Sequence, residues 1–211
     1  MTDAEVRKPV PAWIWGGALL AASAVVPTGV RAVAPGGLGS GVAIVAIVLF
    51  AASLVVFAFG LRGRGSIVAR RPSGVAALLV LAILPPLVGL AIAALSNEQD
   101  IPRLQILSAV HLAVTAAAAL VAVVAIGRAA VIPRPWHWAP AWGFAAMAVT
   151  FALPQIAAVS ASGTGLDDLT GLFVLGSLVA LAMPLALGIL AMVLGARGLT
   201  VASAQIYPPA A

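Results

Sequence analysis

The stretch Leu61–Pro72, LRGRGSIVARRP, decides how this chain is threaded. It separates two long apolar runs and contains four of the eleven Lys and Arg residues, Arg62, Arg64, Arg70 and Arg71. Because four cations so close together enter hydrocarbon only at a high cost in free energy, the loop stays on the side where it is made. In a membrane protein that side is the cytoplasm, so this loop sets the topology of every other segment.

The composition indicates a membrane protein. Of 211 residues, 63% are hydrophobic and 8% are charged, with a mean hydropathy of +1.17, whereas a soluble domain has about 25% charged residues. The net charge of +5 sits in loops and suits contact with an anionic inner leaflet. No basic face interleaved with aromatic residues is present, so we expect no nucleic-acid partner. The absence of cysteine excludes disulfides, thiolate metal sites and cysteine nucleophiles.

Six apolar runs predict an all-α bundle of six transmembrane helices. Each run is long enough for a hydrocarbon core of about 30 Å, and none alternates like a barrel strand. A cytoplasmic tail is expected at residues 1–11 and another at 199–211. The predicted helices are Ala12–Val30, Gly41–Leu61, Gly74–Leu95, Leu104–Ile126, Ala139–Val159 and Leu169–Leu194.

The first run could instead be a signal peptide. Arg7 and Lys8 would form its charged region, and Ala32-Val33-Ala34 fits a cleavage site. Against this, Pro35 would directly follow the cut and Arg31 lies just before it. We therefore expect a transmembrane helix.

The distribution of basic residues predicts that both termini are cytoplasmic. With the Arg62–Arg71 loop inside, nine basic residues fall on inner segments and two, Arg31 and Arg103, on outer loops. The predominance of Arg over Lys and the abundance of Ala, Val, Leu and Gly are typical of a high-GC bacterium, so the expected location is a bacterial plasma membrane. All five tryptophans fall at the inner interface, where indoles act as anchors: Trp13, Trp15, Trp136, Trp138 and Trp142.

A weak internal period raises the hypothesis of three helical hairpins. Prolines open the three helices that start inside, and the returning helices end near Gly60, Gly127 and Gly195, each close to an arginine. Convergence is the simpler explanation, because glycine ends helices and arginine marks the inner face.

Polar side chains inside the runs are few, and His111 is the one ionisable group well within a predicted span. Gln105, Ser108, His111 and Thr115 share one face of the fourth helix, so this stripe is expected to face other helices. Gln155 and Ser177 lie at similar depths in the fifth and sixth helices. Prolines in the outer halves leave backbone carbonyls without their usual donors. They are Pro27, Pro85, Pro86 and Pro154.

Two interpretations of these polar groups remain. One is a shallow outward-facing pocket, with His111 as a proton-sensitive or ligand-contacting group, formed with Gln155, Ser108, Thr115 and Ser177. The other is structural hydrogen bonding between helices. Small residues on the first helix (Gly16, Gly17, Ala21, Ala22 and Ala24) also allow close packing, either within the chain or against another subunit.

No catalytic, cofactor or metal motif stands out, so we expect neither an enzyme nor a bound cofactor. Asp167 and Asp168 are adjacent carboxylates in a predicted loop and do not form a cation cage. Two functions remain: a solute-binding or transport unit, slightly favoured, and a non-catalytic integral subunit of a larger membrane complex. The partners expected are lipid and either another membrane protein or a second copy of the chain.

Overall fold

In the computed structural model, the prediction of an all-helical bundle is confirmed for the residues that the structure describes, which are 9–33, 39–61, 65–95, 101–132, 136–160 and 167–198. These residues contain six long α-helices whose ends lie within three residues of the predicted ones. The elements are α1 (Pro11–Val33), α2 (Gly39–Phe59), α3 (Pro72–Leu95), α4 (Ile101–Ala129), the 3₁₀ turn η2 (Trp136–Trp138), α5 (Ala139–Ser160) and α6 (Asp167–Arg197).

Five of these helices, α1, α2, α3, α4 and α6, are long and apolar enough to cross a membrane. The described part of the chain is therefore that of a multi-pass helical membrane protein. The crossing by α5 remains a prediction.

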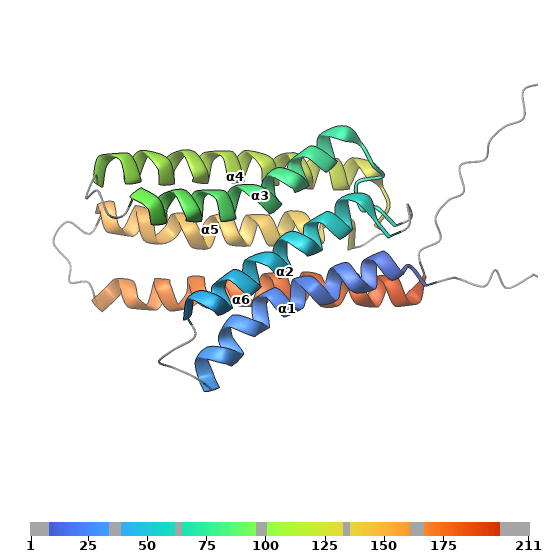
Figure 1. Ribbon diagram of the computed structural model, residues 1–211, viewed down its shortest axis with the longest axis horizontal. Coiled ribbons are helices and arrows are strands. Elements are labelled where there is room, and N and C mark those ends of the chain that lie inside the picture. Colours follow the sequence, from blue (N-terminus) through green and yellow to red (C-terminus); the bar gives the residue numbers. More distant parts are fainter. Residues whose placement is uncertain are drawn as a thin grey trace, which may run out of the picture.

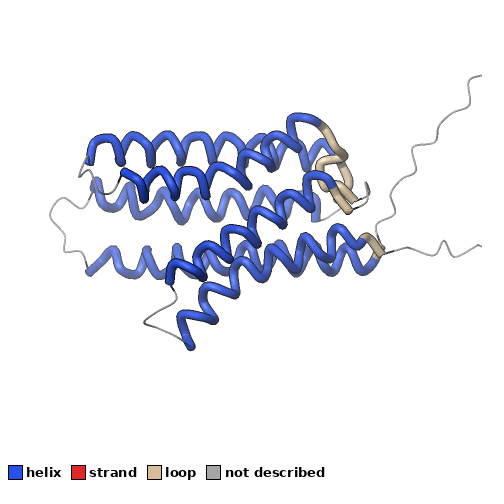
Figure 2. Tube along the Cα trace, in the orientation of Figure 1, coloured by secondary structure: helices blue, strands red, loops and turns tan. Residues whose placement is uncertain are grey.

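The helices form a ring in chain order, closed where α1 packs along α6 (Figure 1). Contacts are extensive between α1 and α2, α2 and α3, α3 and α4, and α5 and α6, but sparse between α4 and α5. Consecutive helices run antiparallel. The connection after α2 lies at the same end of the bundle as the start of α1 and the end of α6 (Figure 2). All segments predicted to be cytoplasmic thus meet at one end, which we call the basic end because Arg70, Arg71, Arg128 and Arg197 are exposed there.

Glycine allows α1 to approach α6 and α2 closely. A Cβ at Gly188 would stand 2.6 Å from the carbonyl oxygen of Gly17, and a Cβ at Gly16 would stand 2.8 Å from the Phe57 ring. Such backbone proximity is how helices pack when lipid removes the hydrophobic drive between them. The hypothesis that Gly16 and Gly17 face another subunit is therefore wrong, because both are buried within the chain.

Trp13 does not lie at a lipid interface, contrary to the prediction. Its side chain is 1% exposed, and its indole N–H donates a 2.8 Å hydrogen bond to the carbonyl of Gly65. The start of α1 is covered by Gly65 of the connection that follows α2 and by α6, whose Gly195 carbonyl accepts a hydrogen bond from the Val10 N–H at 2.9 Å. The side chains of the other four tryptophans are exposed, and that of Trp15 is 63% exposed.

Residues 65–71, the second half of the arginine-rich connection, place a side chain in the core as well as two arginines at the surface. Val68 is fully buried, the Ile67 N–H donates to the Phe57 carbonyl at 3.0 Å, and the Ser66 hydroxyl donates to the Ala58 carbonyl at 2.6 Å. These bonds fold the connection back over the end of α2. Arg62 and Arg64 lie outside the described residues.

The three returning helices end within two residues of the predicted glycines, but only Gly60 lies beyond the end of its helix. Gly60 follows the last residue of α2 with φ of 73°, which is the left-handed conformation that ends many helices. Gly127 and Gly195 instead lie inside α4 and α6. Those two helices end at Ala129 and Arg197, where Ala130 and Gly198 have positive φ.

Candidate functional site

The polar stripe on α4 divides into an exposed part and a half-buried part. Gln105 and Ser108 are exposed, and the Ser108 hydroxyl donates to the Gln105 carbonyl of its own helix at 2.8 Å. His111 and Thr115 are half-buried, one helical turn apart. Nδ1 of His111 and Oγ1 of Thr115 are shielded from solvent and have no hydrogen-bond partner among the described residues. Leaving such a group unsatisfied costs about 1–3 kcal/mol.

The face of α4 that contains His111 and Thr115 continues into the helix's contact with α3. A Cβ at Gly74 of α3 would stand 2.9 Å from the Cβ of Ala125 of α4, which sets the antiparallel register of the two helices. At a rise of about 1.5 Å per residue, Thr115 and His111 lie about 15 and 21 Å from this contact. Pro85 and Pro86, both inside α3, lie about 16–18 Å from it, at the same level.

The same register places further polar groups of α3 near the level of Thr115. Pro85 and Pro86 have no N–H, so the carbonyls of Leu81 and Ala82, about 10–12 Å from the contact, lose their usual helical donors. A hydroxyl, an imidazole nitrogen about one turn further along α4 and these carbonyls are groups that can bind a small polar molecule that both donates and accepts hydrogen bonds. Among the described residues, no group of three or more His, Asp or Glu side chains is placed to hold a metal ion.

The remaining members of the predicted pocket are not brought together with His111 by any described contact. Ser177 is exposed on α6 and makes an interaction of its own. The Gln155 side chain lies outside the described part of the chain. Two cavities are defined by described residues, and neither is lined by His111, Thr115, Ser108 or Ser177.

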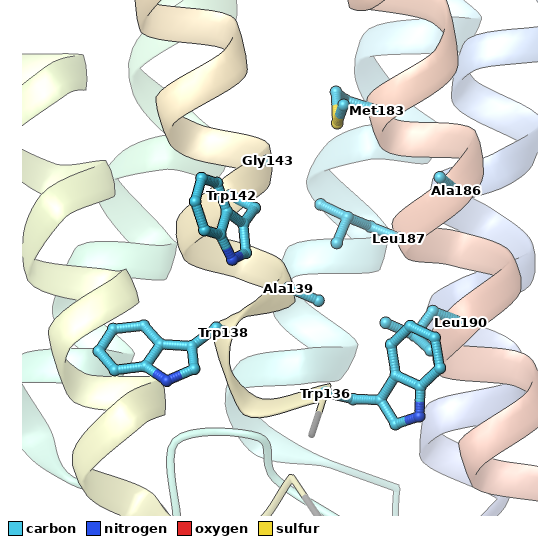
Figure 3. Close-up of a pocket in the computed structure, with 9 residues that line it drawn as sticks. All are labelled: Trp136, Trp138, Ala139, Trp142, Gly143, Met183, Ala186, Leu187 and Leu190. Carbon is cyan, nitrogen blue, oxygen red and sulfur yellow. The ribbon is translucent and has the colours of Figure 1, made fainter. Parts of the chain in front are cut away.

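The larger cavity is an open groove of about 460 Å³ between the start of α5 and the C-terminal half of α6. Figure 3 shows Trp136 extending toward Leu190 of α6, Trp138 extending the other way, and Leu187 extending toward α5. Gly143 makes room for this leucine, because a Cβ there would stand 3.1 Å from Cδ1 of Leu187. The groove is lined by Trp136, Trp138, Ala139, Trp142, Gly143, Met183, Ala186, Leu187 and Leu190.

Comparison with known proteins finds no match for this chain. No protein-family model matches the chain, and neither a curated protein nor a solved structure does. The function must therefore be inferred from the chain's own residues.

The smaller cavity, of about 140 Å³, is lined by residues from all six helices and by Ile67 and Ile132 of two connections. It shares Leu187 and Leu190 with the groove. The lining side chains are apolar apart from the indole N–H of Trp13, which already donates its hydrogen bond to the Gly65 carbonyl.

Sequence analysis did not identify these apolar cavities. A signal was present for the groove, since three tryptophans within seven residues precede and open a helix. No signal marked Leu187, Leu190 or Ile67, because leucine and isoleucine occur throughout the chain. Only the packing of α5 on α6 distinguishes these side chains from those that face lipid.

Proposed function

We propose that this chain is a non-enzymatic, six-span protein of a bacterial plasma membrane, with both termini cytoplasmic, that binds or transports a small polar solute. The solute would be held in the outer half of the bundle by His111 and Thr115 of α4. Gln155 and Ser177 are further candidates on α5 and α6. The proposed membrane orientation rests on the excess of basic residues at one end.

The observation that supports a binding function is the pair of buried, unpartnered atoms on α4. His111 Nδ1 and Thr115 Oγ1 lie on one helix face, and the two carbonyls of α3 that Pro85 and Pro86 leave without donors lie closest to the level of Thr115. Purely structural polar groups inside a bundle usually bond to one another. A solute that supplies the missing partners would recover about 1–3 kcal/mol per satisfied group.

The test compares His111→Ala, Thr115→Val and Ser108→Ala with the wild-type protein. Each is purified and screened by thermal shift against a panel of amino acids, sugars and organic ions, and each is then assayed for uptake of any hit in proteoliposomes. We expect His111→Ala and Thr115→Val to lose the hit's stabilisation and its uptake, with little change in apparent melting temperature without solute. Ser108→Ala is the matched control, because that hydroxyl is exposed and bonds only to its own helix.

Two results would count against the proposal. In one, His111→Ala lowers the melting temperature without solute as much as with it, which would make the histidine structural. In the other, the control Ser108→Ala loses binding to the same degree.

The second candidate is an integral subunit of a larger membrane complex, and the seam between α4 and α5 favours it. These two helices touch sparsely, so the ring could accept a partner's helix there. Purification from native membranes in mild detergent, followed by mass spectrometry, distinguishes the two functions. A stoichiometric partner protein supports the subunit, whereas recovery of the chain alone supports the solute-binding unit.

A further inference from the structure

We propose that the groove between α5 and α6, together with the adjoining interior cavity, binds one acyl chain of an anionic phospholipid from the leaflet at the basic end. This inference relies on the membrane location proposed above but not on a solute site at His111. It starts from the walls of the two cavities. Among the side chains that line the groove, only the indoles carry an N–H donor and the others are apolar, so a ligand that fits it is largely apolar.

The two cavities adjoin, because Leu187 and Leu190 line both and form the wall between them. Gly143 lets Leu187 reach across to α5, where its Cδ1 lies 3.1 Å from the position of an added Cβ. A change of the Leu187 rotamer would therefore open the groove toward the interior. Figure 3 shows this side chain between the two helices, directly beside Gly143 and Trp142.

The interior cavity selects against water. At about 140 Å³ it is large enough for water, but a buried water needs two to four polar partners, and the one N–H at the wall already donates to Gly65. Apolar cavities of roughly this size stay dry and accept small apolar groups. Within a bilayer, the abundant apolar chain that can reach such a cavity through a side opening is an acyl tail.

The position of the groove fixes which leaflet and which headgroup would be involved. Trp136, Trp138 and Trp142 are 49%, 59% and 74% exposed, and exposed tryptophans mark the level of the headgroups. Arg128 and Arg197 are exposed at the same end of the bundle, with Arg197 about 10 Å beyond Leu190 along α6. A phosphate at this level would meet positive charge, while its acyl chain runs along α6 toward Met183.

Native mass spectrometry of the full chain tests this proposal. The protein is incubated with equal amounts of phosphatidylglycerol, phosphatidylcholine and free palmitate, and is then washed extensively in lipid-free detergent. We expect the wild type to retain one phosphatidylglycerol. Ala186→Phe, which places a ring in the groove, should lose it. Ala180→Phe is the matched control, being exposed on the same helix but outside both cavities.

A second pair of variants tests the interior cavity. Ala191 lines it and is buried, so Ala191→Leu should abolish lipid retention and raise the apparent melting temperature in lipid-free detergent. Ala196→Leu, exposed one turn further along α6, should do neither. If Ala191→Leu does not fold, Ala186→Phe decides the question alone, because residue 186 is on the exposed wall.

Three outcomes would overturn the proposal. The first is that the wild type retains no lipid after washing. The second is that Ala180→Phe loses lipid to the same extent as Ala186→Phe, which indicates ordinary annular lipid. The third is that phosphatidylcholine or palmitate is retained as well as phosphatidylglycerol. None of the four variants alters His111 or Thr115, so failure here leaves the solute-binding test unaffected.

Discussion

At the scale of single residues, the basic end is held together by hydrogen bonds to backbone carbonyls that lie far away in sequence. Trp13 donates to Gly65, and the fully buried Ser53 hydroxyl donates to the Gly16 carbonyl at 2.9 Å. In an apolar interior, leaving such a donor or acceptor unpaired costs more free energy than the completed hydrogen bond contributes to stability. These two side chains therefore fix how α1 meets α2 and the connection that follows α2.

Trp13→Phe removes the indole N–H while keeping an aromatic ring. The Gly65 carbonyl would lose its donor, so we expect a loss of about 1–3 kcal/mol of stability, which is several degrees in apparent melting temperature for a chain of this length. Thermal unfolding in detergent measures this. Trp15→Phe is the control, because Trp15 is 63% exposed and should tolerate the change. Equal melting temperatures for the two variants would show that the Trp13–Gly65 bond contributes little.

At the scale of helices, the contact between α1 and α6 depends on two glycines that face each other. A Cβ at Gly188 would stand 2.6 Å from the Gly17 carbonyl oxygen and 2.9 Å from the Ala21 nitrogen. Both neighbours are backbone atoms, which cannot rotate away. The two helices would have to separate, which would weaken a contact that closes the ring.

Gly188→Ala should therefore destabilise the protein by about 1–3 kcal/mol, the usual cost of overpacking. Gly171→Ala, in the same helix with no atom within 4 Å of an added Cβ, should be neutral or stabilising by up to about 1 kcal/mol. Apparent melting temperatures of both variants check this. If Gly188→Ala were as stable as Gly171→Ala, the close contact between α1 and α6 would not hold in the folded protein.

At the scale of the whole molecule, the antiparallel ring gathers four exposed arginines of its described part, Arg70, Arg71, Arg128 and Arg197, at one end, and the proposed topology places this end in the cytoplasm. Arg103 lies at the opposite end, in the first turn of α4. The arrangement of helices fixes which segments share a side, but charge alone indicates which side is cytoplasmic.

Because the chain contains no cysteine, single introduced cysteines can report this sidedness. Ser73→Cys, exposed at the basic end, and Gln105→Cys, exposed near the other end, are treated in intact cells with a maleimide that cannot cross membranes. We expect labelling of Gln105→Cys alone, and labelling of Ser73→Cys once the membrane is opened. Labelling of Ser73→Cys in intact cells would show that the basic end faces the outside, which is the opposite of the proposed topology.

The sequence by itself determined the class of the protein, the six helices and their approximate ends. Helix length, apolar runs and proline or glycine positions are local properties, and lipid forces every apolar run into a helix because no backbone group can remain unpaired there. Tertiary structure alone decided which tryptophan is buried, that Gly16 and Gly17 pack within the chain, and that only His111 and Thr115 of the α4 stripe turn inward. It also decided where apolar cavities form. These features depend on which helix faces are paired, and in a chain where nearly every face is apolar, hydropathy does not distinguish a helix neighbour from lipid.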